Sequence, residues 1–216
     1  MTTVLARISA MSPRRSDSRQ RLVTAAADML AQHGLNATSI REMARRADAP
    51  LGSTYHYFPG GKHQMVVEAV QLAGARVSAA LDHHLQSGFS TGLRGFLDDW
   101  RDILMQTDFR IGCPVMAAAV EEPVDDVADD VLEVAAETFD TWEQRLVRAL
   151  LEEGHERASA QGMATLIVAS IEGAIVLCRA RRDISPFDAV AGQLHLSVQS
   201  SRKSPTRAKR VKPKSA

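Results

Sequence analysis

The chain has 216 residues, of which 45% are apolar and 24% are charged, and its 26 basic side chains balance its 26 acidic ones. This composition excludes a chain that is disordered over most of its length, and the length supports one or two folded domains with a sizeable core. Two cysteines, Cys113 and Cys178, are too few for a secreted disulfide framework and fit a reducing cytoplasm.

The balanced total conceals an uneven distribution of charge along the chain. Residues 1–62 carry nine Lys or Arg and four Asp or Glu, residues 63–196 carry ten and 22, and residues 197–216 carry seven and none. A polyanion is therefore expected to meet the two ends of the chain and not its middle. Ordinary solvated surface is the alternative interpretation of the same charges.

The first predicted elements are a long helix and a short one. An apolar stripe at helical spacing predicts a helix over residues 17–33, and its members are Leu22, Val23, Ala26, Met29 and Leu30. Gly34 follows, where a left-handed residue commonly ends a helix. Ser39 and Glu42 form a capping box that opens a short helix ending near Asp48.

A second short helix follows directly. Pro50 suits its first turn, because the fixed φ of proline matches a helix and its missing N–H has no partner there. The Pro-Gly-Gly run at residues 59–61 stops this helix after Phe58. Two short helices joined by a tight turn, behind a longer helix, have the spacing of a helix-turn-helix.

Helical spacing continues through the rest of the chain, and no alternating strand pattern longer than a few residues occurs. The fold class is therefore predicted to be all-α. Further helices are expected at residues 62–86, 93–104, from 112, 125–153, 163–178 and 187–198, with Gly88 to Gly92 separating the first two. The 163–178 stretch is apolar nearly all round, so it lies either centrally in the core or against a partner.

Neither a secretory signal nor a membrane span is expected. Residues 1–15 have no continuous apolar region of the kind that a signal peptide needs. The apolar stretch at 163–178 contains Glu172 and is shorter than the roughly 20 residues that cross a bilayer. The sequence therefore predicts a cytoplasmic chain with no membrane partner.

The segment from Ala47 to Lys62, ADAPLGSTYHYFPGGK, resembles the recognition-helix signature of the TetR family of transcriptional regulators. The resemblance is close over residues 17–83 and rests on helix count and order beyond them. The Ala-Pro-x-Gly-Ser and Phe-Pro-Gly-Gly-Lys patterns, with Gly-Cys-Pro-Val at 112–115, are similar to the LmrA/YxaF-type branch. Asp48 stands where the family usually has Gly, and aspartate tolerates left-handed geometry well.

The resemblance implies an N-terminal three-helix DNA-binding domain followed by a helical ligand-binding and dimerisation domain. These would occupy residues 17–62 and 63–200, with a flexible basic arm at 1–16 and a disordered basic tail at 201–216. The tail is expected either to add nonspecific attraction to DNA or only to solvate the chain.

Double-stranded DNA is the expected partner of the helix-turn-helix. Ser53, Tyr55 and His56 offer groups able to reach phosphates and base edges. The basic arm and the start of the helix after Ser39 offer phosphate contacts. The expected DNA-binding residues are Arg14, Arg15, Arg19, Thr38, Ser39, Pro50, Leu51, Ser53, Tyr55, His56 and Lys62.

A homodimer is expected, because one small reading helix makes few base contacts and two helices about 34 to 36 Å apart, or somewhat further, can read a palindromic site. The helices at 163–178 and 187–198 would form a four-helix bundle with those of the partner. Ser170, Gly173 and Ala174 would permit close approach, and the seam would be filled by Leu166, Ile167, Ile171 and Leu177.

The resemblance also implies a repressor that a small hydrophobic effector releases from its operator. The residues expected to line the effector pocket are Trp100, Leu104, Phe109, Cys113, Met116, Phe139, Trp142 and Glu172. An aromatic and methionine stripe at helical spacing also occurs in an ordinary core, so core packing is the alternative for each of them.

Two other functions stay open on the sequence alone. A sequence-nonspecific architectural DNA-binding protein would use the basic ends, and a cysteine-dependent enzyme would use Cys113 as its nucleophile. The chain has no His-x3-His or Cys-x2-Cys spacing and no phosphate loop. We therefore expect no metal, no cofactor and no enzymatic activity.

Overall fold

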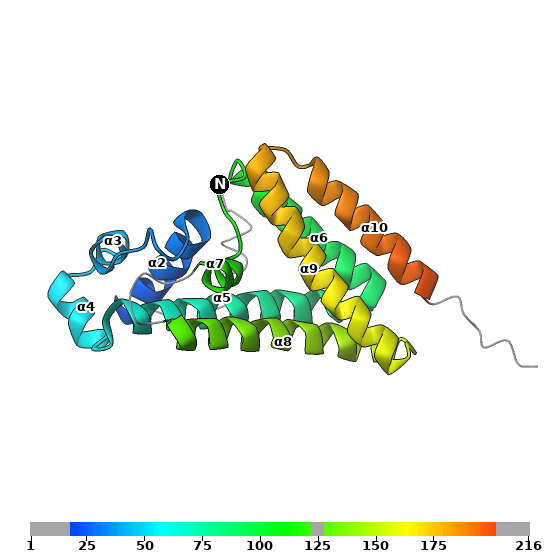
Figure 1. Ribbon diagram of the computed structural model, residues 1–216, viewed down its shortest axis with the longest axis horizontal. Coiled ribbons are helices and arrows are strands. Elements are labelled where there is room, and N and C mark those ends of the chain that lie inside the picture. The colour runs from blue at the N-terminus through cyan, green and yellow to red at the C-terminus, as the bar shows by residue number, and fades with distance from the viewer. Residues whose placement is uncertain (1–17, 122–127, 202–216) are drawn as a thin grey trace, which may run out of the picture.

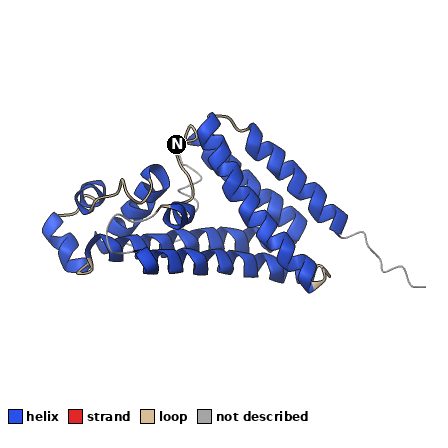
Figure 2. Cartoon of the chain, viewed as in Figure 1, coloured by secondary structure: helices blue, strands red, loops and turns tan. Residues whose placement is uncertain are grey.

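The computed structural model describes residues 18–121 and 128–201, and within them every regular element is a helix. The elements are α2 (Ser18–His33), α3 (Ile40–Arg46), α4 (Leu51–Tyr57), α5 (Gly61–Leu85), α6 (Phe89–Gln106), α7 (Pro114–Val120), α8 (Ala128–Glu152), α9 (Arg157–Arg181) and α10 (Ser185–Ser201). The all-α prediction is confirmed (Figure 2).

Two long helices form the base of the molecule. Figure 1 shows α5 and α8 side by side along this base, with α2, α3 and α4 gathered at one end and α6, α9 and α10 rising at the other. We call α2–α4 the reading head and α6–α10 the body; α5 passes from one to the other.

Local sequence signals set most helix boundaries. Gly34 has a φ of 81° directly after α2, and Asp48 has a φ of 49° in the turn between α3 and α4, as their positions predict. Pro50 is the N-cap of α4 and not part of its first turn. Gly92 lies inside α6, because Gly88 alone, with a φ of 88°, breaks the chain before Phe89.

The structure extends α9 beyond its predicted start. The helix has 25 residues, and by length and apolar composition it is long enough to cross a membrane, although 39% of its most apolar window is buried against the rest of the chain. The buried residues include Ile167, Ile171 and Ile175. A helix with one face packed in this way fits the core of a bundle, so its composition is weak evidence for a membrane span.

Glycine permits close contacts between α5 and the helices packed on it. Gly74 of α5 accepts a hydrogen bond from the indole Nε1 of Trp142 at 3.2 Å, and a Cβ there would lie 2.5 Å from the Thr138 methyl group. At Gly92 of α6, a Cβ would lie 2.5 Å from the backbone oxygen of His84 at the end of α5. Backbone atoms cannot rotate away, so α6 can follow α5 at this angle only with glycine at position 92.

We predict that Gly92→Ala destabilises the fold by about 2 kcal/mol or more, as overpacking of a filled core does. Chemical denaturation followed by circular dichroism measures this loss. Gly162→Ala in α9 is the matched control, because a Cβ at position 162 meets no atom within 4 Å. Equal unfolding free energies for the two variants would contradict the close contact.

Candidate functional site

The turn of the helix-turn-helix is held by caps that the sequence encodes. The Ser39 hydroxyl accepts a hydrogen bond from the Glu42 backbone N–H at 3.3 Å, which is the N-cap half of the predicted capping box. The Glu42 carboxylate turns away and accepts from Arg45 Nε at 2.8 Å. In the turn, the Ala49 N–H donates to the Ala44 carbonyl at 3.0 Å.

Helix α4 has one buried face and one exposed face. Thr54 and, just past the helix end, Phe58 are almost fully buried, and they anchor α4 on the reading head. On the other face, Leu51, Tyr55 and His56 are exposed, and the Tyr55 side chain is 56% exposed. A short rod fixed by two buried residues therefore presents a phenol, an imidazole and an apolar side chain to solvent.

Most of the predicted DNA-binding residues share this end of the molecule. Pro50, Leu51, Ser53, Tyr55 and His56 lie on α4 or directly before it, and Lys62 lies in the first turn of α5. Ser39 is exposed at the start of α3. Figure 1 shows α3 and α4 at the tip of the head, remote from α9 and α10.

Two members of the predicted set have other roles. Thr38 is 4% exposed, and its hydroxyl donates to the Leu35 carbonyl at 2.6 Å, so burial removes it from reach of a phosphate. Arg19 forms an ion pair with Glu68 at 2.7 Å and its guanidinium lies 5.0 Å from the Phe58 ring centroid. Arg19 thereby joins α2 to α5. Arg14 and Arg15 lie outside the described residues.

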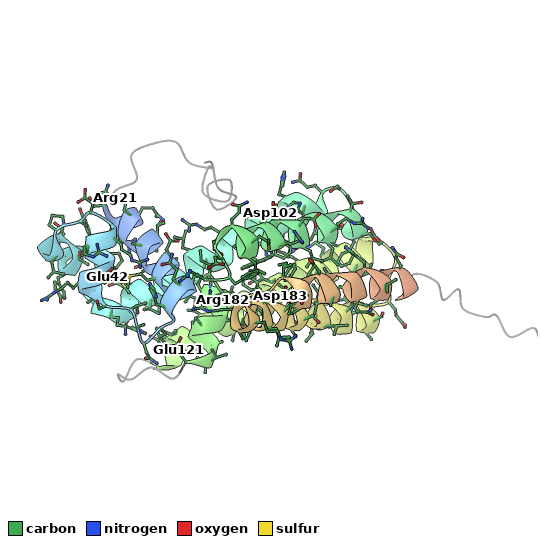
Figure 3. All side chains as sticks on the ribbon, turned by 90° about the horizontal axis from the view of Figure 1, so that it is seen from above. Arg21, Glu42, Asp102, Glu121, Arg182 and Asp183 are labelled. Carbon is green, nitrogen blue, oxygen red and sulfur yellow. The ribbon has the colours of Figure 1, made fainter. Side chains whose placement is uncertain are left out.

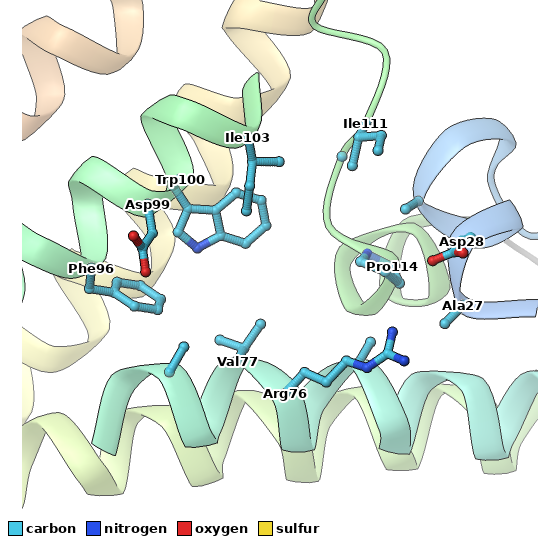
Figure 4. Close-up of a pocket in the computed structure, with 14 residues that line it drawn as sticks. Ala27, Asp28, Arg76, Val77, Phe96, Asp99, Trp100, Ile103, Ile111 and Pro114 are labelled. Carbon is cyan, nitrogen blue, oxygen red and sulfur yellow. The ribbon is translucent and has the colours of Figure 1, made fainter. Parts of the chain in front are cut away.

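An apolar cavity of about 90 Å³ lies where the head meets the body. Figure 4 shows Phe96 and Trp100 of α6 on one side and Val77 of α5 below them. Asp99 lies at the aromatic end, where it contacts His84 Nε2 at 2.7 Å. At the other end, Arg76 reaches along α5 toward Asp28 of α2, as Figure 4 also shows.

The predicted effector residues do not gather around this cavity. Trp100 alone lines it. Cys113 and Met116 line a second cavity, of about 190 Å³, while Trp142 and Glu172 line a third one of about 20 Å³ that shares Trp100 with the first.

The other three predicted effector residues line none of these three cavities. Leu104 is fully buried, Phe109 is nearly so, and Phe139 packs edge-on against Trp142 at 5.4 Å between ring centroids. Core packing, the alternative interpretation of the stripe, applies to these three residues.

Glu172 is a carboxyl group in an apolar setting. It is 8% exposed on α9 and lines the small cavity with Trp100 and Trp142. Burial raises its pKa to about 7, against which a hydrogen bond with Cys113 acts weakly. Burial also raises the pKa of the Cys113 thiol well above its ordinary value, so this cysteine is held as an inert thiol and is a poor nucleophile.

The raised pKa of Glu172 predicts a pH dependence of stability. The folded state holds this proton up to about pH 7 and the unfolded state only to about 4.5, so stability falls as pH rises between these values, by about 3 kcal/mol at most. Glu172→Gln should remove this loss and flatten unfolding free energies between pH 5 and pH 8, as measured by urea titration. Glu137→Gln, at an exposed position of α8, should keep the wild-type slope; identical slopes in all three proteins would refute the assignment.

Metal binding finds no support in the part of the chain that the structure describes. There, no three His, Cys, Asp or Glu side chains gather closely enough to hold an ion.

The outward face of α9 and α10 carries exposed apolar and small residues. Leu166 and Leu177 of α9 are 48% and 43% exposed and Leu196 of α10 is 57% exposed, while a Cβ at Gly173 or Gly192 would meet nothing within 4 Å. Of the residues expected to face a partner, Ile167, Ile171 and Ala174 are instead buried within their own chain. Their side of α9 faces inward because α9 packs against α8 and α10.

Two family models match the chain. Residues 22–69 match the model for bacterial regulatory proteins of the tetR family, and residues 90–193 match the model for the C-terminal domain of LmrA/YxaF-like transcriptional regulators. The first match contains α3 and α4 entire, and the second spans most of the body.

Relatives match over nearly the whole chain. The HTH-type transcriptional regulator Rv0196 of Mycobacterium tuberculosis, itself uncharacterized, is 38% identical over 179 residues, which cover 82% of this chain and 91% of the relative. The HTH-type transcriptional regulator LmrA of Bacillus subtilis is 26% identical over 183 residues, covering 84% and 93%.

Solved structures share the fold. A TetR transcriptional regulator from Legionella pneumophila has a TM-score of 0.74 at 20% identity and covers 86% of this chain and 98% of its own. The regulatory protein TetR from Rhodobacter sphaeroides has a TM-score of 0.75 at 22% identity, with 84% and 99% covered.

Proposed function

The chain belongs to the TetR family of bacterial transcriptional regulators, and we propose that it is a cytoplasmic homodimeric repressor that a small effector releases from a palindromic operator. The observation that carries the proposal is the exposed face of α4, where Leu51, Tyr55 and His56 project from a helix anchored by Thr54 and Phe58. A helix presented in this way enters a major groove with its side chains at the base edges.

The outward face of α9 and α10 supports the proposal that the chain forms a homodimer. Leu166, Leu177 and Leu196 are exposed in the single chain, and two glycines on the same face leave room for a second copy. Four helices from two chains would bury these residues together. Because this face lies far from α3 and α4 (Figure 1), such a dimer leaves both reading helices open to DNA.

The cavity beside Trp100 supports the proposal that the chain binds a small effector. Its walls come from α2 of the head and from α5 and α6, so a molecule bound there contacts both parts that must move. At about 90 Å³ it is smaller than the 300 to 1,000 Å³ typical of ligand sites. Binding of a larger effector would therefore require the head to shift from the body, which is the displacement that releases DNA.

The proposed domains are residues 17–62 for DNA binding and 63–200 for ligand binding and dimerisation. The basic arm at 1–16 and, apart from Ser201, the basic tail at 201–216 lie outside the described residues. The family consists of transcriptional regulators and not enzymes, and the buried thiol of Cys113 fits that description.

Selection of bound duplexes from a random-sequence pool by the full chain tests the proposed function. Recovery of one inverted repeat supports it, and a screen for small molecules that release the recovered duplex then tests the effector. Recovery of unrelated sequences with equal affinity would favour an architectural DNA-binding protein instead. If no screened molecule weakens binding to the recovered duplex, the result counts against release by a small effector.

A further inference from the structure

The C-terminal end of α2 is held by an arginine from α9. Arg179 donates from Nη1 to the Ala31 carbonyl at 3.1 Å and from Nη2 to the Gln32 carbonyl at 2.6 Å. These two residues lie in the last turn of α2, where the partial negative charge of the helix dipole is concentrated. One planar guanidinium therefore joins the body to two carbonyl groups of the reading head.

A carboxylate from the end of α7 holds the turn that follows. Glu121 accepts from the Leu35 N–H through Oε1 and from the Asn36 N–H through Oε2, both at 3.0 Å. The carboxylate lies against Gly34, since a Cβ there would be 1.9 Å from Oε1. Charge-assisted bonds of this kind are among the stronger hydrogen bonds in proteins. We call Arg179 and Glu121 the α2 clamp.

The clamped segment continues directly into the DNA-reading helices. Gln32, whose carbonyl accepts from Arg179, also accepts through its side-chain Oε1 from Arg46 Nη1 at 2.9 Å. Arg46 is the last residue of α3, and the turn to α4 follows it. Gln32 therefore links Arg179 of α9 to Arg46 at the end of α3.

On the body side, the clamp connects with the buried Glu172 and Cys113 pair. Arg179 lies seven residues after Glu172 on α9, which places both on the same side of the helix. Gly112 precedes Cys113, and its N–H donates to the Ala31 carbonyl at 2.8 Å. Displacement of Cys113 by a molecule in the cavity of about 190 Å³ that it lines would therefore move Gly112, an anchor of α2.

Apolar packing at this junction is incomplete. The cavity of about 190 Å³ is bordered by Gly34 of the head, by Cys113 and by both members of the clamp. Helix α2 packs on α5 and on α7, and the polar contacts of Arg179 and Glu121 add to this packing where the cavity leaves it incomplete. These polar contacts are therefore placed to restrict rotation of α2 on its apolar supports.

We propose that Arg179 and Glu121 are positioning residues that fix the orientation of the reading head on the body, and that they thereby set which spacing between two half-sites the dimer accepts. The inference rests on the proposed function. A residue with only a structural role would change affinity for all duplexes alike, whereas a positioning residue changes the ratio of affinities between duplexes of different spacing.

Distances between two spin labels, measured by double electron–electron resonance, test the clamp without DNA. Spin labels are placed at Arg41→Cys in α3 and Asp102→Cys in α6, both exposed positions, whereas Cys113 and Cys178 are buried. Labelled chain is diluted in excess unlabelled chain so that each distance is measured within one chain. We expect a narrow distribution in the parent and a broader or shifted one in Arg179→Ala and in Glu121→Gln.

Arg182→Ala is the matched control. Arg182, labelled in Figure 3, lies directly after α9 and donates to the Asp108 carbonyl at 2.8 Å. It therefore makes the same kind of contact within the body and none that is assigned to the head. Its distance distribution should equal that of the parent. Unchanged distributions in folded Arg179→Ala and Glu121→Gln would overturn the proposal. Should Arg179→Ala fail to fold, Arg179→Lys keeps the charge but cannot bridge both carbonyls, and it serves in its place.

Operator spacing supplies the second readout. The duplex recovered by selection is compared with a copy carrying two extra base pairs between its half-sites, and the parent should bind this copy much more weakly. In Arg179→Ala the ratio between the two affinities should fall about fivefold or more, while Arg182→Ala should keep it. An unaltered ratio counts against the clamp. Failure of the parent to bind any inverted repeat would instead contradict the proposed function, and the distance measurement would still decide on the clamp.

Discussion

Replacing Leu177 and Leu196 together by aspartate is expected to give a folded monomer whose operator affinity is at least about 100-fold weaker, because one head replaces two. Both side chains lie on the outward face of α9 and α10 and are about half exposed in the single chain, so aspartate there costs the isolated fold little. In the dimer the same carboxylates would be buried opposite copies of themselves, where charge is strongly unfavourable.

Sedimentation velocity measures the assembly state, and fluorescence anisotropy with the selected duplex measures affinity. Leu132→Asp is the matched control, since Leu132 is 53% exposed on α8, a helix outside the proposed interface. This control should stay dimeric and bind DNA as the parent does. A double variant that still sediments as a dimer would place the interface elsewhere.

Removing the phenol of the reading helix should have the second largest effect. Tyr55→Ala is expected to weaken operator binding by about 5- to 150-fold, which corresponds to the 1 to 3 kcal/mol of a good base or phosphate contact. Thermal unfolding should change little, because the side chain is 56% exposed and α4 is anchored by other residues. Tyr55→Phe separates the hydroxyl from the ring.

Lys62→Ala provides a useful contrast to Tyr55→Ala. Loss of a phosphate contact weakens binding to all sequences similarly and lowers the slope of affinity against salt by about one. Met105→Ala, at a 49% exposed position of α6, should change neither affinity nor slope. Wild-type operator binding by Tyr55→Ala and Lys62→Ala alike would contradict α4 as the reading helix.

Features set by neighbouring residues could be predicted from the sequence. The positive φ of Asp48 and the Ser39 cap follow from the chemistry of a few adjacent residues, and so does the end of α4, which lies at Tyr57, one residue earlier than predicted. Helix order follows equally from apolar spacing. These local signals suffice to identify the family and to place Tyr55 on a helix surface.

Features set by tertiary contacts were predicted less well. The pattern of residues 163–178 shows an apolar helix, but whether Ile167 or Leu166 faces outward depends on where α8 and α10 pack. Thr38 precedes a helix, yet its burial against Leu35 depends on how α2 and α3 meet. Both errors have one cause: local sequence signals do not show which other elements pack against a given residue.

The cavity shows the same limit at a larger scale. Two of its charged residues, Asp28 and Arg76, come from α2 and α5. Neither residue interrupts the apolar stripe of its helix, so the sequence does not mark either one as a cavity residue. The two clamp residues, Arg179 and Glu121, also read as ordinary helix-end charges. Only the folded chain brings Arg179 to the carbonyl groups of Ala31 and Gln32.

The central claim is that two copies of this chain place two α4 helices on one inverted repeat. The most direct test is the mass of the complex between the full chain and the selected duplex, measured by native mass spectrometry. We predict two chains per duplex, with the complex lost when one half-site is scrambled. One chain per duplex, or an undiminished complex on a single half-site, would contradict the account.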